Sequence, residues 1–217
     1  MIEPRRPLKY AGWAAMAGTL LLLSGCGINN IPTYKQQVNA AWSQVLNEYQ
    51  RRTDLIPNLV ATVKGYAAHE ASVLEAVTDA RAKVTQTRIP ADILTNPAAF
   101  RQFEKNQATL GGALSRLMVV TENYPNLKAD QNFLVLQAQL EGTENRITVA
   151  RHRYIEAVQG YNVLLRTFPN NLTARMFKYS LKQNFAVQDE SQIARPPAVN
   201  FGTSTGTAAP AAGAAAQ

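Results

Sequence analysis

The sequence predicts an all-α protein: an antiparallel up-down bundle of three to four helices with one long kinked first helix and a disordered C-terminal tail. Over long stretches, apolar residues recur at steps of three or four, which is the spacing of an amphipathic helix. No stretch alternates between apolar and polar residues as a half-buried strand does. The connections between helical stretches are short, which places consecutive helices antiparallel to one another.

The first helical stretch is the longest, and we expect it to run from Tyr34 to about Val84. Its apolar stripe keeps its phase across Pro57, which favours a kink over a break although proline removes one backbone hydrogen bond. At 1.5 Å per residue this helix would be roughly 75 Å long. It would then extend beyond its shorter neighbours and offer part of its stripe to another helix or another molecule.

The second helix has the clearest start signal. Asn96 can cap it, and Pro97 follows at the first helical position, where a missing N–H costs nothing. Gly111 and Gly112 weaken its middle, and close contact with a neighbouring helix is the expected reason. The remaining helical stretches are predicted at about residues 128–167 and 172–181.

The N-terminus resembles a bacterial lipoprotein signal. Three basic residues precede an apolar run of 13 residues, Ala11 to Leu23, which is short of the ~20 needed to cross a membrane. The run leads into Leu23-Ser24-Gly25-Cys26, which is similar to a lipobox, and Cys26 is the only cysteine of the chain. We therefore expect Cys26 to be lipidated after cleavage. The alternative is an uncleaved membrane anchor.

These features divide the chain of 217 residues into four parts. They are a lipoprotein signal peptide (1–25), a lipidated tether (26–33), a helical bundle (34–195) and a disordered tail rich in Ala, Gly and Thr after two prolines (196–217). We expect a location in the cell envelope with the bundle outside the cytoplasm. Because glycine and not aspartate follows Cys26, the periplasmic side of the outer membrane is favoured in a cell with two membranes.

Several motifs of the chain resemble the LemA family. They are residues 50–60 (QRRTDLIPNLV), 63–70 (VKGYAAHE), 140–147 (LEGTENRI), 150–154 (ARHRY), Tyr161-Asn162 and Phe168-Pro169. Their order and number make the resemblance specific, and it covers roughly residues 34–201. It implies a membrane-attached helical bundle facing the outside of a bacterial cell. The chain departs from many relatives by carrying a lipobox where they keep a plain membrane helix.

The polar segment that includes Glu141, Glu144 and Arg146 is the first candidate site. Glu144 falls at or beside the apolar seam of its helix, where a carboxylate needs a partner because an unpaired buried charge is strongly unfavourable. Three bases of the first helix are possible partners: Arg51, Arg52 and Lys64. The segment is either an ion-pair layer that fixes the helix register or a polar site where a ligand or a partner helix docks.

The run Arg51-Arg52-Thr53-Asp54 is the second candidate. Asp54 is expected to accept hydrogen bonds from backbone groups freed near the proline kink, and the two arginines suit a phosphate or carboxylate. The alternative is a solvated helix face with a local Glu48–Arg52 pair, worth only about 0.3–0.5 kcal/mol.

Catalytic and cofactor motifs are missing from the sequence. There is no Gly-x-Ser-x-Gly elbow and no phosphate loop, and the two histidines, His69 and His152, do not form a metal-binding pair. We expect no enzyme activity, no metal and no cofactor. The net charge of +7 is scattered along helices without a basic run, so nucleic acid is not an expected partner.

The function expected from these observations is that of a non-enzymatic cell-envelope lipoprotein, a membrane-tethered helical scaffold or interaction module. Its partners would be the membrane, through the lipid anchor, and an envelope protein or a second copy of the chain. The alternative is a binding module for anionic lipid or cell-wall polymer, which would use Arg51, Arg52 and the polar segment 141–146. A hydrolase acting on the cell wall is a third and more remote hypothesis.

Overall fold

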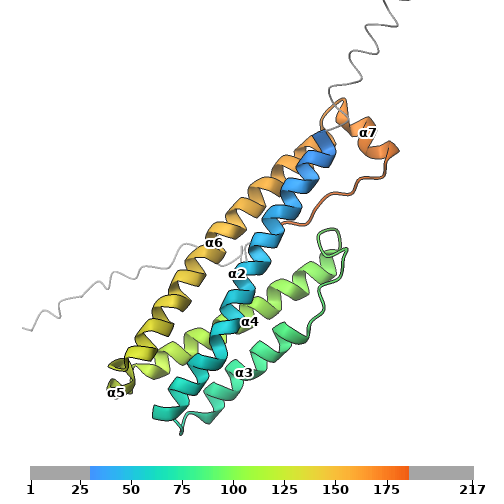
Figure 1. Ribbon diagram of the computed structural model, residues 1–217. Helices are drawn as coiled ribbons and strands as arrows, with labels where there is room; N and C mark the ends of the chain where they lie inside the picture. The colour runs from blue at the N-terminus through green and yellow to red at the C-terminus, as the bar shows by residue number, and fades with distance from the viewer. Residues whose placement is uncertain (1–29, 186–217) are drawn as a thin grey trace, which may run out of the picture. The chain divides into compact units, whose positions relative to one another are not determined.

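The computed structural model describes residues 30–185, and all regular secondary structure in this range is helical (Figure 1). Its helices are α2 (Asn30–Tyr66), α3 (Ala71–Gln86), α4 (Pro97–Thr121), α5 (Pro125–Lys128), α6 (Gln131–Arg166) and α7 (Asn170–Met176). The predicted all-α class is confirmed, with six helices in this part of the chain instead of three to four. The predicted signal peptide, Cys26 and the C-terminal tail lie outside the described residues.

The N-terminal boundary of the bundle also differs from the prediction. α2 begins at Asn30, so residues 30–33 of the expected tether are helical, and the side chain of Ile31 is fully buried. Among residues 30–185, no helix combines the length and the apolar character that crossing a membrane requires.

The predicted single long first helix is wrong, because two helices occupy that stretch. α2 ends at Tyr66, and the chain turns at residues 67–70, where the Glu70 N–H donates to the carbonyl of Ala67 at 3.1 Å. α3 then runs back beside α2 (Figure 1). The apolar stripe stays in phase because Ala67, Leu74 and Val77 all enter the same core as the end of α2. The spacing of the apolar residues therefore indicates which residues are buried, but it does not indicate whether one helix continues.

Pro57 lies inside α2 without ending it, and α3 explains how. Proline has no N–H, so the carbonyl of Thr53, four residues earlier, loses its helical donor. Arg81 of α3 replaces that donor, because its Nε donates to the Thr53 carbonyl at 3.2 Å. The break that returns α3 along α2 therefore also satisfies the acceptor that the proline leaves free.

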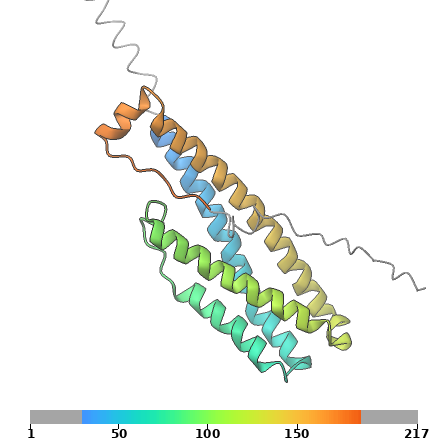
Figure 2. The same cartoon turned by 180° about the vertical axis from the view of Figure 1, so that it is seen from behind.

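α2 and α6 are antiparallel and lie side by side, as Figures 1 and 2 show from opposite sides. Three contacts show the antiparallel arrangement, because residue numbers rise along α2 while those of the partners fall towards the start of α6. The rings of Trp42 and Tyr154 are 5.3 Å apart, the side chains of Arg52 and Glu144 form an ion pair, and the hydroxyl of Tyr66 donates to Asp130 at 3.0 Å.

The core consists of two apolar clusters. The first surrounds the N-terminal half of α2 and is rich in aromatic residues, including Trp42, Tyr49, Phe100, Phe103 and Tyr154. The second surrounds the end of α2 and is mainly aliphatic, including Ile56, Leu59, Leu110, Leu117 and Leu140. The polar residues between the clusters on α2, α4 and α6 are buried: Arg52, Thr53, Gln107 and Thr143.

The segment after α7 packs back along the bundle in an extended form. The predicted amphipathic helix at 172–181 is shorter, because α7 ends at Met176. Beyond it, the Tyr154 hydroxyl donates to the Gln183 carbonyl at 2.7 Å, and the N–H of Lys182 donates to the side-chain carbonyl of Asn162 at 2.9 Å. Tyr-Asn at 161–162, one of the motifs noted above, therefore contributes to holding this segment.

The glycine pair of α4 has no packing role. A Cβ on Gly112 would meet nothing within 4 Å, and one on Gly111 would meet only the Arg52 side chain at 3.8 Å, an ordinary contact. The expected close helix approach is therefore wrong at this position. It occurs at Gly160 of α6, where a Cβ would lie 3.0 Å from the Tyr34 ring.

Candidate functional site: a buried polar layer

The candidate site is a layer of polar side chains between the two apolar clusters. We define the polar layer as Arg52 of α2, Gln107 of α4, and Thr143 and Glu144 of α6. Arg52 is its centre, with only 4% of its side chain exposed. It lies on the apolar stripe of α2, one turn after Tyr49 and one turn before Ile56, so the helix itself directs it inward.

Arg52 joins three helices. Its Nη1 donates to the two carboxylate oxygens of Glu144 at 3.0 and 3.3 Å. Its Nη2 donates to the side-chain oxygen of Gln107 at 2.6 Å and to the Gln107 backbone carbonyl at 3.2 Å. The guanidinium carbon also lies 5.0 Å from the centre of the Tyr49 ring, within cation–π distance. The planar fork of arginine suits this role, because it can bind both neighbours at once.

The two charges of this ion pair are in unequal environments. Arg52 is buried, whereas 46% of the Glu144 side chain is exposed. Water can therefore compensate Glu144 if the pair is broken, but it has poor access to Arg52, whose charge depends on its protein partners. Burial also raises the pKa of the neighbouring Tyr49 hydroxyl, against the opposing effect of the positive charges of Arg151 and Arg52. Tyr49 thus remains neutral beside the arginine.

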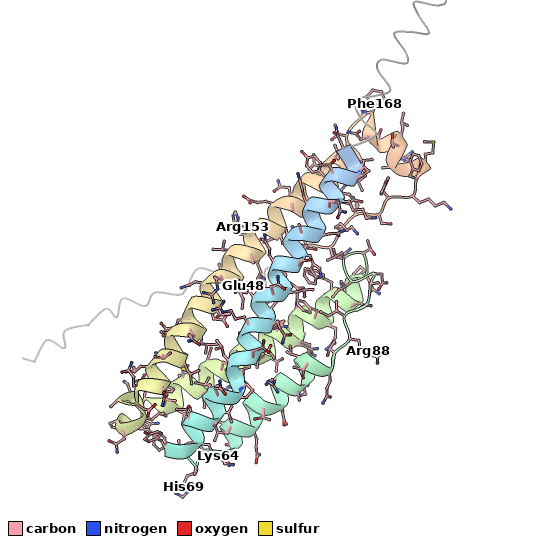
Figure 3. The ribbon with its side chains drawn as sticks, viewed as in Figure 1. Glu48, Lys64, His69, Arg88, Arg153 and Phe168 are labelled. Carbon is pink, nitrogen blue, oxygen red and sulfur yellow. The ribbon has the colours of Figure 1, made fainter. Side chains whose placement is uncertain are left out.

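A second ion pair links the same two helices nearer the surface. Arg146 Nε donates to Glu48 Oε2 at 2.9 Å, and Arg146 Nη2 donates to the hydroxyl of Thr143 at 2.8 Å (Glu48 is labelled in Figure 3). The two pairs have opposite polarity along the helices. Sliding α2 past α6 by about one turn would bring Glu48 towards Glu144 in one direction and Arg52 towards Arg146 in the other. Like charges therefore oppose both slips.

The other predicted site residues lie outside the polar layer. Arg51 is exposed, and so is Asp54, which accepts a hydrogen bond from the Gln50 side chain at 2.7 Å. The expected role of Asp54 at the kink is wrong, because the proline frees a carbonyl and not an N–H. Glu141 is exposed and accepts from Gln137 at 3.0 Å.

The partner choice is also resolved in the structure. Among the three bases considered for Glu144, Arg52 contacts it, whereas Arg51 and Lys64 are exposed elsewhere on α2. The expected local Glu48–Arg52 pair is not formed, because each of the two residues pairs with α6.

Gln107 and Thr143 are not among the predicted site residues, although the position of each in its helix carries a signal. Gln107 falls on the apolar stripe of α4, four residues after Phe103 and three before Leu110. Thr143 occupies the same kind of position on α6, three residues after Leu140. A polar residue in register with an apolar stripe on three separate helices predicts a buried polar layer.

A groove of about 400 Å³ lies beside the polar layer, between α2, the end of α3 and the first half of α4. Its wall includes Tyr49, Thr53 and Gln107, and amide side chains such as Gln50 and Asn106 line it as well. Solvent can therefore reach the neighbours of the polar layer from this side.

Comparison with known proteins identifies the family. The model of the LemA family matches residues 41–201, which is most of the chain. The chain belongs to the LemA family. The resemblance found in the sequence motifs is thus confirmed, and the family region contains the whole polar layer.

Some curated relatives of this LemA-family chain are magnetosome proteins. MamQ 1 and MamQ 2 of Paramagnetospirillum magneticum are each 26% identical over 165 residues, which cover 67% of this chain and 60% of the relative. MamQ of Magnetospirillum gryphiswaldense is 25% identical over 136 residues, covering 55% and 50%. The chain therefore spans only about 60% or less of the length of these relatives.

Proposed function

We propose that this LemA-family protein is a non-enzymatic lipoprotein of the cell envelope that acts as a membrane-tethered helical scaffold or interaction module. The observation that carries the proposal is that Arg52 links three helices. Its donors bind Glu144 and Gln107 of two other helices, so the most polar residues of the interior hold helices in register. A fixed register gives the bundle one constant surface, which is what a docking platform needs.

The predicted lipidation of Cys26 supports the tether. Only three residues separate Cys26 from Asn30, the start of α2. At about 3.3–3.6 Å per residue, that stretch spans at most about 14 Å. The bundle would therefore begin close to the membrane surface, and lipoprotein acyl chains would hold it more firmly than a single reversible chain.

The alternative function, binding of anionic lipid or cell-wall polymer through Arg51, Arg52 and residues 141–146, has weaker support. Arg52 is 4% exposed and already bonded, and Arg146 is paired with Glu48, so of the arginines of this patch only Arg51 is free of such a bond among the described residues. Another group of exposed basic residues, Arg166, Arg175 and Lys178, lies around α7.

The tether is tested by the intact mass of the mature protein. A chain that begins at Cys26 and carries acyl mass supports the proposal, and Cys26→Ser should abolish both changes. An unprocessed N-terminus in the unaltered protein would contradict lipidation and leave the hydrophobic segment as the anchor.

The scaffold role is tested by photo-crosslinking in intact cells. A photoreactive residue at Thr85, which lines the groove, is compared with one at Thr109, which is exposed on α4 and does not line it. A discrete crosslinked product at Thr85 and none at Thr109 supports a docked partner. A protein that stays monomeric and gives no specific product at either position argues against a scaffold.

A further inference from the structure

Exposed apolar side chains gather around α7. We call the α7 surface the group formed by Phe168, Leu172, Met176 and Phe177, all of which are exposed. Phe168 and Met176 reach 74% and 71% exposure, although both are large and apolar. Leu172 and Met176 are four residues apart in α7, which places them on one face of that helix, and Phe168 lies in the turn just before it. A grouped apolar surface of this kind marks an interaction site more often than scattered single residues do.

Positive charge surrounds the α7 surface. Arg166, Arg175 and Lys178 are exposed and line a hollow of about 530 Å³ beside α7. Residues 157–185 contain four basic residues and no aspartate or glutamate. Within residues 30–185, none of the ion pairs involves these three side chains. Their charges are therefore available to an anionic partner.

Two further lysines add to this charge. Burial lowers the pKa of Lys182, and the nearby positive charge of Lys35 lowers the pKa further. Ile31 and Val38 of α2 and Tyr179 after α7 belong to the same apolar cluster, so the first turns of α2 and the segment after α7 lie at the same end of the bundle. The basic character therefore extends from α7 to the start of the bundle.

The α7 surface lies at the end of the bundle where α2 begins, as Figures 1 and 2 both show. The contact between Gly160 of α6 and the Tyr34 ring of α2 confirms that the end of α6, which leads into α7, lies beside the start of α2. Cys26 precedes Asn30 by four positions, so an anchor at Cys26 would hold this same end within about 14 Å of the membrane. An anchor in the apolar run, which ends at Leu23 seven positions before Asn30, would hold it within about 25 Å. This step rests on the proposed tether.

We propose that the α7 surface docks onto an anionic lipid bilayer, with its apolar side chains at the acyl boundary and Arg166, Arg175 and Lys178 against the lipid phosphates. The combination of an apolar face with a basic rim is the chemistry by which peripheral helices bind membranes. A second copy of this chain is a poorer occupant, because pairing two such ends would bring like charges together.

Docking gives the tether a defined direction. A lipid chain alone lets the bundle rotate about its attachment point. A second contact at α7 would fix the bundle with the α2–α3 turn directed away from the bilayer. In Figure 3, Phe168 and His69 mark these opposite ends. The groove and the far end of the bundle would then be presented to partners at a set height.

The test uses the full chain in vesicles that contain phosphatidylglycerol, with an environment-sensitive fluorophore on Met176→Cys. Val119→Cys is the matched control, because Val119 is also apolar and 70% exposed but lies near the end of α4, towards α5. Intact mass verifies that only the introduced cysteine carries the label. We expect a blue shift and quenching by lipid-borne nitroxide at position 176 and neither at position 119.

Charge variants test the basic rim. Arg175→Gln and Lys178→Gln should each lower the ratio of docked to undocked protein about fivefold, and phosphatidylcholine vesicles should weaken the signal in the same direction. Equal signals on neutral vesicles and in both variants would overturn the anionic preference.

The remaining outcomes separate docking from the tether. A label at position 176 that stays in water while the protein floats with the vesicles overturns docking and leaves the tether intact. Failure to float with the vesicles overturns both. A blue shift that needs no vesicles and grows with protein concentration assigns the surface to a second copy and overturns the membrane proposal.

Discussion

The clearest consequence of the polar layer is that Glu144 and Arg52 should be energetically coupled. Glu144→Ala removes the partner of a buried arginine, and breaking a buried pair in this way costs about 3–5 kcal/mol. Glu144 is 46% exposed and Arg52 keeps its two bonds to Gln107, so the pair is screened and the arginine is partly compensated. We therefore expect Glu144→Ala to lower the free energy of unfolding by about 2–3 kcal/mol.

The double variant Arg52→Met/Glu144→Ala should be less destabilised than the sum of the two single variants. Methionine refills the space of the arginine stem and removes the charge that Glu144→Ala leaves unpaired. A coupling of about 1.5 kcal/mol is expected, within the range found for residues in one hydrogen-bond network.

Urea unfolding followed by far-UV circular dichroism measures the four free energies, with unchanged denaturant slopes as the check on two-state behaviour. Arg51→Met is the matched control, because Arg51 neighbours Arg52 in the sequence but is exposed. Its effect should add to that of Glu144→Ala within about 0.5 kcal/mol. If the effect of Arg52→Met also added to that of Glu144→Ala within about 0.5 kcal/mol, the polar layer would not act as a unit and would not fix the helix register.

Three further predictions concern the backbone. Arg81→Met should lower the free energy of unfolding by about 1–2 kcal/mol, because the Thr53 carbonyl loses its donor. The loss should be smaller in a Pro57→Ala background, where a backbone N–H is restored. Urea unfolding of the four variants measures both losses, and equal losses would contradict this role of Arg81. Gly112→Ala should raise the unfolding free energy by about 1 kcal/mol in the same assay, since the added Cβ meets nothing, and no gain would argue against an exposed helical glycine. Hydrogen bonds from the N–H of Phe133 and then from the hydroxyl of Tyr66 lower the pKa of Asp130 below 3.8. The stability that the ionised Asp130 contributes is therefore complete above pH 3.8 and is lost as the pH falls through the lowered pKa. Asp130→Asn should weaken the fall of the melting temperature at acid pH, and an unchanged fall would contradict this prediction.

The helix-start signal at Asn96-Pro97 gave a correct boundary. The N-cap predicted at Asn96 is confirmed, because its side chain accepts from the N–H groups of Ala98 and Ala99 at 3.1 and 3.2 Å. α4 accordingly begins at Pro97. Such signals are reliable because the capping atoms are only two or three residues from the cap itself.

The turn at residues 67–70 was not predictable in the same way. It has no proline, Glu70 makes no side-chain cap, and the apolar stripe runs through it. Contacts from distant parts of the chain hold it, since the Tyr124 hydroxyl donates to Glu70 and the Tyr66 hydroxyl donates to Asp130, each at 3.0 Å. The sequence contains these residues but not their proximity.

The sequence by itself determined the helical class, the family and two residues of the polar layer, Arg52 and Glu144, because periodicity, caps and motifs are local properties. Only the tertiary structure decided that the first stretch folds back as two helices, that Arg52 and not Arg51 meets Glu144, and that the exposed apolar residues of α7 lie beside the start of α2. Each of these depends on which segments meet in space. A helix pattern fixes the face that a residue occupies, whereas its partner is fixed by the packing of all the helices together.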